Sequence, residues 1–450
     1  MIASACLTTL ASCSLFVDLS DLSKPNDAGS GVSDSAAGDA IVSKDGSLEQ
    51  NDGAAISLTP HLLAAVGNVP AETGMAQQQH LIYAANGSRW WFFFITDSQP
   101  GNMNASWSDD FTSWNAANTR GLSETMGGEG RNFSVAYASL GGVDIVHTIN
   151  SHFFGTTEDA RHARNTIHGT NITYETGITV ASAAPFDTLA NPDGCVTALG
   201  SDGFVYDASG YFNQKPTTGV DTLGHQDIFR STIADVGAPT WTASLPHDFS
   251  AAASGYVHNR ALIPLANGTM LALWPTTETP TDTGNIASST TASPLTNVFS
   301  GGTGTAMNAM NDWSACAVTP SDVHVVRRLL DGGKNDTFEH MRRNGTDGTW
   351  SAAGTIAPDP GKYGSGVVLV SQGTELLLVT IANDANDSVR GSKWNGTSWS
   401  AWTTIVGTPA TRSYLSGSGC GTGAAKSGVV WTEGDGASYK VVGVDVSSLF

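Results

Sequence analysis

The chain has few charged residues and no long apolar run. Only 14% of its 450 residues are charged, and 21 Lys and Arg stand against 41 Asp and Glu, so the formal net charge is −20. So acidic a surface repels phosphate groups and anionic lipid headgroups, and we therefore expect no nucleic-acid partner. No segment approaches the roughly 20 apolar residues that a membrane-spanning helix needs.

Cysteine is also scarce. The five cysteines are Cys6, Cys13, Cys195, Cys316 and Cys420. The sequence has no Cys-x-x-Cys and no paired-histidine spacing, so we predict no metal-ligand set. The last three cysteines are predicted to lie in the first strands of three non-adjacent repeats, beyond the Cα separation of about 7 Å that a disulfide allows. We therefore expect these three to be small, buried and unpaired.

What the chain does contain is 51 glycines and a recurring pair of apolar strands. The tight turns between the paired strands recur at intervals of 51 to 65 residues, at Gly87, Gly142, Gly203, Gly268, Asp322, Gly373 and Gly428. This period matches one four-stranded blade of a β-propeller. We predict an all-β propeller of seven blades, each of four antiparallel strands. Six or eight blades remain alternatives, because the first and fourth repeats are irregular.

The sixth repeat shows the pattern clearly. Residues 366–371 and 375–381 are almost continuously apolar, which predicts strands buried between neighbouring blades. Residues 388–394 and 398–405 flank an Asn-Gly-Thr turn, a strong hairpin signal. Tryptophans recur in the last hairpin of several repeats, and we expect them to pack between blades rather than to bind ligand.

Two further expectations concern the ring. The last repeat is one strand short, and residues 54–63 are the natural donor of the missing outer strand, which would leave no open edge. Residues 152–168 are predicted to form a long loop inserted in the second repeat, bordering a binding face.

The N-terminus predicts an exported protein. A short apolar run precedes Leu10-Ala11-Ser12-Cys13, which resembles the lipobox of bacterial lipoproteins. The resemblance implies a signal peptide over residues 1–12 and lipidation of Cys13. No Lys or Arg precedes Cys13, and the alternatives for this departure are a truncated start and a start assigned too late. Residues 13–53 are predicted to be a disordered acidic linker, and residues 54–450 the propeller. The expected location is the cell envelope: the outer membrane, periplasm or exterior. The alternative is an accidental apolar start.

Three short stretches resemble known propeller families. Arg260–Trp274 is similar to a strand pair of sialidase-type propellers, with Ala261 and Leu262 intervening in the Arg-Ile-Pro pattern. Ser108–Trp114 resembles the Asp-box of the same superfamily, one residue short and without its glycine. Trp394–Trp402 is similar to repeats of bacterial seven-bladed lectins, which bind sugars between blades.

The loops that lead into the innermost strands carry the candidate site residues. We predict ligand contacts from Arg131, Arg260, Arg412, His258, Trp313 and Tyr363. The resemblance to sialidases implies that the three arginines hold one carboxylate. It also implies Tyr414 as nucleophile with Glu129 or Glu433 as base, and Asp193 or Asp312 as acid. No cofactor or metal is expected, with a structural Ca²⁺ among the acidic loops left open.

Polar loop ends occur in any soluble protein, so these residues do not by themselves make an enzyme. We therefore favour a non-catalytic, lipid-anchored module that binds carbohydrate or another cell-surface polymer as a monomer. A sialidase-like exo-glycosidase acting on a terminal acidic sugar is the first alternative. A scaffold for protein partners is the second.

Overall fold

The structure is a computed structural model. It describes residues 57–67, 77–96, 99–118, 120–121, 125–126, 133–154, 157–182, 193–215, 219–241, 260–266, 268–275, 286–290, 293–299, 312–329, 337–358, 366–382, 384–420, 425–434 and 438–450. The chain divides into two units, residues 1–52 and 53–450. The predicted signal peptide, Cys13 and the whole of the predicted linker therefore lie outside the described residues.

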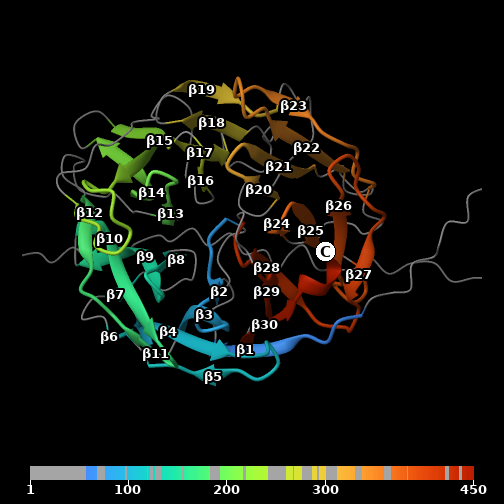
Figure 1. The fold of residues 1–450 in the computed structure, drawn as a ribbon, viewed down its shortest axis with the longest axis horizontal. Helices are drawn as coiled ribbons and strands as arrows, with labels where there is room; N and C mark the ends of the chain where they lie inside the picture. The colour runs from blue at the N-terminus through green and yellow to red at the C-terminus, as the bar shows by residue number, and fades with distance from the viewer. Residues whose placement is uncertain are drawn as a thin grey trace, which may run out of the picture. The chain divides into compact units, whose positions relative to one another are not determined.

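Antiparallel sheets make up the second unit, in a ring around a central axis (Figure 1). The first sheet contains β2 (Leu81–Ala84), β3 (Arg89–Thr96), β4 (Gln99–Ser108), β5 (Asn115–Ala116) and β6 (Arg120–Gly121). The second contains β7 (Thr125–Met126), β8 (Phe133–Leu140), β9 (Val143–Phe154), β10 (Thr157–His168), β11 (Asn171–Thr173) and β12 (Ile178–Ser182). The third contains β13 (Asp193–Leu199), β14 (Val205–Lys215) and β15 (Gly219–Arg230).

The remaining four sheets follow in chain order. The fourth contains β16 (Ala261–Pro264), β17 (Met270–Pro275), β18 (Ile286–Thr290) and β19 (Ser293–Asn297). The fifth contains β20 (Trp313–Thr319), β21 (Asp322–Leu329), β22 (Thr337–Arg343) and β23 (Trp350–Ala352). The sixth contains β24 (Val367–Gln372), β25 (Glu375–Ile381), β26 (Val389–Trp394) and β27 (Thr403–Val406). The last contains β28 (Arg412–Gly417), β29 (Gly428–Glu433), β30 (Tyr439–Asp445) and β1 (His61–Gly67), before a short 3₁₀ turn, η3 (Ser447–Leu449).

The prediction of an all-β propeller is thus confirmed, while the prediction of seven four-stranded blades needs correction. Six of the sheets have four or more strands, and the third has three among the described residues. No helix in the described part of the chain is long and apolar enough to cross a membrane.

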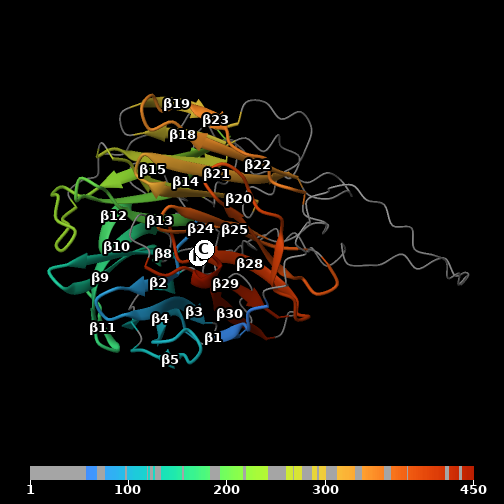
Figure 2. The ribbon, with the colours of Figure 1, turned by 45° about the vertical axis from the view of Figure 1, so that its right-hand side comes forward.

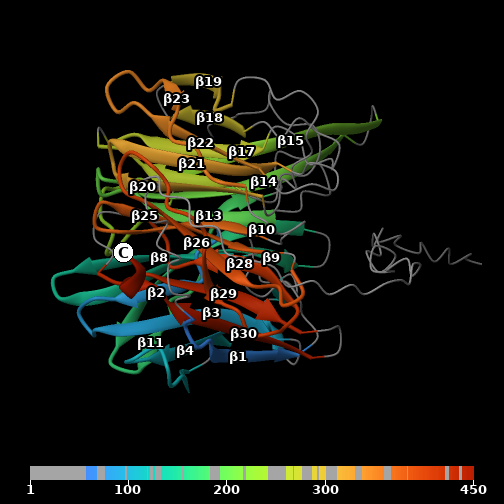
Figure 3. The ribbon, with the colours of Figure 1, turned by 90° about the vertical axis from the view of Figure 1, so that its right-hand side faces the viewer.

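Both ends of the second unit contribute to one sheet, as predicted. β1 pairs antiparallel with β30, from His61 opposite Gly443 to Gly67 opposite Tyr439. Figures 2 and 3 show β1 beside β30, although these are the first and the last strands of the described chain. The strand begins later than the predicted residues 54–63, and it covers the outer edge of β30.

Apolar side chains fill the space between neighbouring sheets. One cluster joins Leu377 and Val379 on β25 to Trp431 on β29, and another joins Leu273 on β17 to Val325 on β21. Because both faces of these strands are covered, their sequences lack polar alternation. Burial between sheets therefore explains the apolar runs from which the repeats were recognised.

Tryptophans of the last hairpins lie between sheets, as predicted. Trp399 Nε1 donates a hydrogen bond to His340 Nδ1 of the preceding sheet at 3.0 Å. Trp350 Nε1 likewise donates to Ser288 Oγ of the preceding sheet at 3.0 Å. Trp241 packs against His162, with ring centroids 5.1 Å apart. Each indole thus joins two sheets by packing and often by a directed hydrogen bond.

Two other predictions were wrong. Residues 152–154 and 157–168 lie in β9 and β10, which pair from Phe154 opposite Thr157 to Asp144 opposite Ile167, and not in a loop. Cys316 and Cys420 form a disulfide, with Cα atoms 5.3 Å apart. Cys420 lies beyond the end of β28, and its Sγ lies 3.3 Å from Leu369 O on β24, so this segment crosses β24 to reach β20. Cys195 is buried and is not part of a disulfide, as expected.

Candidate functional site

A cavity of about 430 Å³ occupies the centre of the ring. Its wall contains residues from one inner strand of every sheet: β2, β8, β13, β16, β20, β24 and β28. Much of the lining consists of small apolar side chains such as Ala136, Ala198, Ala261 and Ala315. Small residues are required here because seven strands converge on one axis, and they leave a space that larger side chains would fill.

Hydroxyl and amide groups give the cavity its polar character. They belong to Gln77, Gln79, Ser134, Thr197, Ser314, Thr319, Ser418, Tyr83 and Tyr137. Lys426 is the one charged residue among the described lining residues, which include no Asp, Glu or His. These lining side chains provide hydrogen-bond partners for a neutral or singly anionic ligand, and no carboxylate pair for acid–base chemistry.

Three consecutive glutamines, residues 77–79, cross the channel just before β2; we call them the glutamine strap. The strap hydrogen-bonds to the inner strands of several sheets. Gln77 Nε2 donates to Trp313 O of β20 (3.4 Å), Gln78 Nε2 to Cys195 O of β13 (3.2 Å) and Gln79 Nε2 to Ser418 O beyond β28 (2.7 Å), while Val135 N of β8 donates to Gln79 O (2.9 Å). Gln78 is fully buried. The strap therefore bridges sheets on different sides of the ring.

Two tyrosines and the lysine lie toward the other ends of the inner strands. Tyr137 Oη donates to Asp144 Oδ1 at 2.6 Å and accepts a hydrogen bond from Ala85 N at 2.9 Å. Burial, followed by this hydrogen bond to Asp144, raises the pKa of Tyr137 to about 12, so it remains a neutral phenol. Lys426 Nζ lies 5.4 Å from the centre of the Tyr83 ring.

Several predicted site residues lie outside the described part of the chain. These are Glu129, Arg131, His258, Tyr363 and the predicted lipidation site Cys13. Asp193 begins β13, and only its backbone is described. Arg260 and Trp313 lie at the beginnings of β16 and β20, where both are buried. The predicted clustering of Arg131, Arg260 and Arg412 is thus untested.

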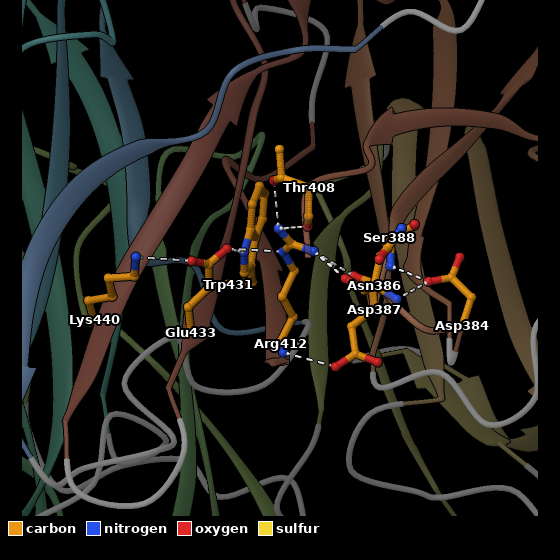
Figure 4. A network of polar contacts seen from close by, with 9 residues as sticks. All are labelled: Asp384, Asn386, Asp387, Ser388, Thr408, Arg412, Trp431, Glu433 and Lys440. Atoms are coloured by element: carbon orange, nitrogen blue, oxygen red, sulfur yellow. Dashed lines mark hydrogen bonds and ion pairs between the residues drawn. The ribbon is translucent and has the colours of Figure 1, made fainter. Parts of the chain in front are cut away.

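The Arg412 guanidinium is surrounded by hydrogen-bond acceptors of the protein itself (Figure 4). Its Nε donates to Glu433 Oε1 at 3.0 Å, and its remaining four N–H groups face Asn386 O, Asp387 O, Thr408 O and Thr408 Oγ1 at 2.8–3.2 Å. A guanidinium has five N–H donors, and protein acceptors use all five. Glu433, proposed as a base, also accepts from Trp431 Nε1 at 3.0 Å and lies 3.2 Å from Lys440 Nζ. Both residues are therefore engaged in stabilising the last sheet.

The other candidates have different surroundings. Asp312 is buried in an ion pair with Arg328 of β21, and Arg328 also donates to Thr380 Oγ1 of the next sheet at 3.2 Å. Tyr414 lies within β28 with φ of 55°. A positive φ is uncommon for a bulky residue, and it coincides with the register shift between β28 and β29.

The Asp-box resemblance corresponds to a turn. The Asp110 carboxylate accepts hydrogen bonds from Thr112 N, Thr112 Oγ1 and Ser113 N at 2.6–3.0 Å. Asn395 Oδ1 accepts from Thr397 and Ser398 in the same way in the sixth sheet. These Asx turns fix the last hairpin and place the following tryptophan. Neither turn is among the described residues that line the central cavity.

The glutamine strap and Lys426 were missed by the sequence analysis. The available signal for the strap was the run of three glutamines directly before the first inner strand. Lys426 lies two residues before β29, on the side of the ring opposite to the loops from which a site was predicted.

No protein-family model matches the chain, and no curated protein matches it. Solved structures show distant similarity. A fucose-specific lectin from Aleuria aurantia has 11% identity, covering 69% of this chain and 95% of the lectin, with a TM-score of 0.42. The polysaccharide lyase Uly1 has 10% identity, 84% and 91% coverage and a TM-score of 0.46. An α-L-arabinanase from Penicillium chrysogenum has 10% identity, 86% and 99% coverage and a TM-score of 0.42.

Proposed function

We propose that this propeller binds carbohydrate in its central cavity and does not cleave it. The observation that carries the proposal is the lining of the cavity: hydroxyl and amide groups, one lysine and small apolar side chains, without a carboxylate or histidine among its described residues. A cavity of about 430 Å³ lies within the usual range for small-molecule sites. Sugars offer many hydroxyl groups that pair with such a lining.

The chemistry of the lining also favours binding over hydrolysis. Most glycosidases place two carboxyl groups across the scissile bond, one as acid and one as nucleophile or base. The candidate base Glu433 and the candidate acid Asp312 are both in buried ion pairs. A sialidase-like activity would therefore depend on residues outside the described ranges, including Glu129 and Arg131.

The proposal includes attachment to the cell envelope. Lipidation of Cys13 would anchor the protein, with residues 13–53 as a flexible linker that holds the propeller clear of the membrane. Metabolic labelling with an alkyne fatty acid tests this part, and a Cys13→Ser variant that still carries label would refute it.

A glycan array tests the binding function. We expect sugar binding by the wild-type protein and its loss in Ala136→Phe, because this side chain lines the cavity and a benzyl group would occupy it. Ala352→Phe, at an exposed position of β23, is the matched control and should bind as the wild type does. Release of fluorophore from a sialoside would instead support the hydrolase. Absence of both activities, with capture of a defined protein partner, would support the scaffold.

A further inference from the structure

The two ends of the cavity differ. At one end the glutamine strap spans the channel, with partners on β8, β13 and β20 that lie within the first three residues of those strands. The cavity lining continues to the opposite ends of the inner strands, at Leu199, Pro264 and Thr319. A ligand that enters at the end marked by Leu199, Pro264 and Thr319 therefore meets the strap and cannot pass through the ring.

A second segment braces the strap. Ser418 O accepts the hydrogen bond from Gln79 Nε2 at 2.7 Å, and Cys420, two residues later, is joined to Cys316 by the disulfide. Gly419 lies between them with φ of 82°, and a Cβ there would come within 2.7 Å of the Gln79 amide. Only glycine permits this close approach. The strap is therefore fixed to a covalently tethered part of the wall.

The strap is buried as well as bonded. Gln78 is fully buried, and Ser416 Oγ donates to Gln78 O at 2.8 Å, so both its side chain and its backbone are used. Opening the channel at this end would break hydrogen bonds to several sheets at once. Buried amide groups that lose their partners carry a desolvation cost, so the strap is a stable part of the fold and not a mobile lid.

From this geometry we infer that the cavity is a blind pocket that accepts the end of a saccharide chain, and not a channel that holds its middle. The inference rests on the proposed function and narrows it. With a volume of about 430 Å³ the pocket holds roughly one or two sugar rings. A polymer can present such a unit only at a free end, because the next sugar must leave through the open side.

The test compares the same sugars held by opposite ends. The full-length protein is applied to an array on which each oligosaccharide is immobilised once through its reducing end and once through its non-reducing end. We expect each recognised sugar to bind at least tenfold more strongly in one orientation than in the other. Ala136→Phe should abolish this signal, and Ala352→Phe should preserve it.

Three results contradict the inference in different ways. Equal signals in both orientations would show that internal units are recognised, while sugar binding itself stands. An oriented signal that survives in Ala136→Phe would place the site outside the cavity. Absence of signal in both orientations would refute the proposed function and the inference together.

Discussion

Replacing Arg412 separates a structural role for this residue from the ligand-binding role predicted from the sequence. The guanidinium is held by five hydrogen bonds, and its side chain is 1% exposed. Arg412→Met keeps an unbranched apolar stem in the same space and removes every one of these bonds. Glu433 would then remain nearly buried, at 9% side-chain exposure, without its main partner.

The expected cost is large. Removing one member of a buried ion pair typically lowers the free energy of unfolding by about 3–5 kcal/mol. We expect a value toward the lower end of this range, because Glu433 keeps Trp431 Nε1 and Lys440 Nζ as partners. Arg412→Lys keeps the charge, but an ammonium has fewer donors than a guanidinium and a different geometry, so we expect an intermediate loss. Lys440→Met provides the matched control. The Lys440 side chain is 52% exposed, and such surface pairs contribute about 0–1 kcal/mol.

Equilibrium unfolding in urea, followed by tryptophan fluorescence, measures these differences. The variants are compared at equal m-values, so that a shift in midpoint reports stability. The same proteins are then tested for sugar binding without urea, at a temperature at which all of them are folded. The reasoning is refuted if Arg412→Met costs less than about 1 kcal/mol while sugar binding is lost, because the guanidinium would then act on the ligand and not on the fold.

Three further predictions concern the disulfide, two histidines and a turn. Reduction of the Cys316–Cys420 bond, which spans 104 residues, should lower stability by about 2–4 kcal/mol, and equal urea midpoints with and without reductant would contradict this. Burial, and then a neighbouring histidine, lowers the pKa of His147 and of His340 to about 3. Unfolding restores a pKa near 6.5, so stability is complete above about pH 6.5 and falls toward pH 3, by up to about 1.4 kcal/mol per pH unit for each histidine; a flat profile of urea midpoints between pH 7.5 and 4.5 would exclude this. Asp110→Ala should lower the melting temperature more than Asp110→Asn, because the amide oxygen can still accept the bonds of the turn, and equal melting temperatures would rule it out.

The strand pairs of the fold could be predicted because their signals are local. In the sixth repeat the sequence predicted strands over residues 366–371 and 375–381, and the structure has β24 at Val367–Gln372 and β25 at Glu375–Ile381. Turn glycines and continuous apolar runs lie within a few residues of each other, so no knowledge of tertiary contacts is needed. The third repeat was less predictable, since much of the sequence after β15 has no such pattern.

The site was harder to predict because its parts are distant in the sequence. Gln77 and Trp313 are 236 residues apart, and Gln78 and Cys195 are 117 apart. A run of glutamines carries no periodicity, so nothing local indicates that it crosses a channel. Arg412 illustrates the opposite case: a polar residue at a strand end predicted a ligand contact, and tertiary structure surrounds its buried guanidinium with five protein acceptors.

The histidines show why sequence spacing alone misses a repeated contact. His147 and His162 lie on adjacent strands of the second sheet, with ring nitrogens 3.1 Å apart, and His324 and His340 are paired in the fifth at 2.8 Å. The two pairs have the same diagonal register, since His162 is opposite the residue two beyond His147, and His340 opposite the residue two beyond His324. Their sequence separations, 15 and 16 residues, reflect the lengths of different hairpins. Strand pairing shows that the two pairs occupy equivalent positions of the repeat, where His162 of one pair and His340 of the other each contact a tryptophan of the next sheet.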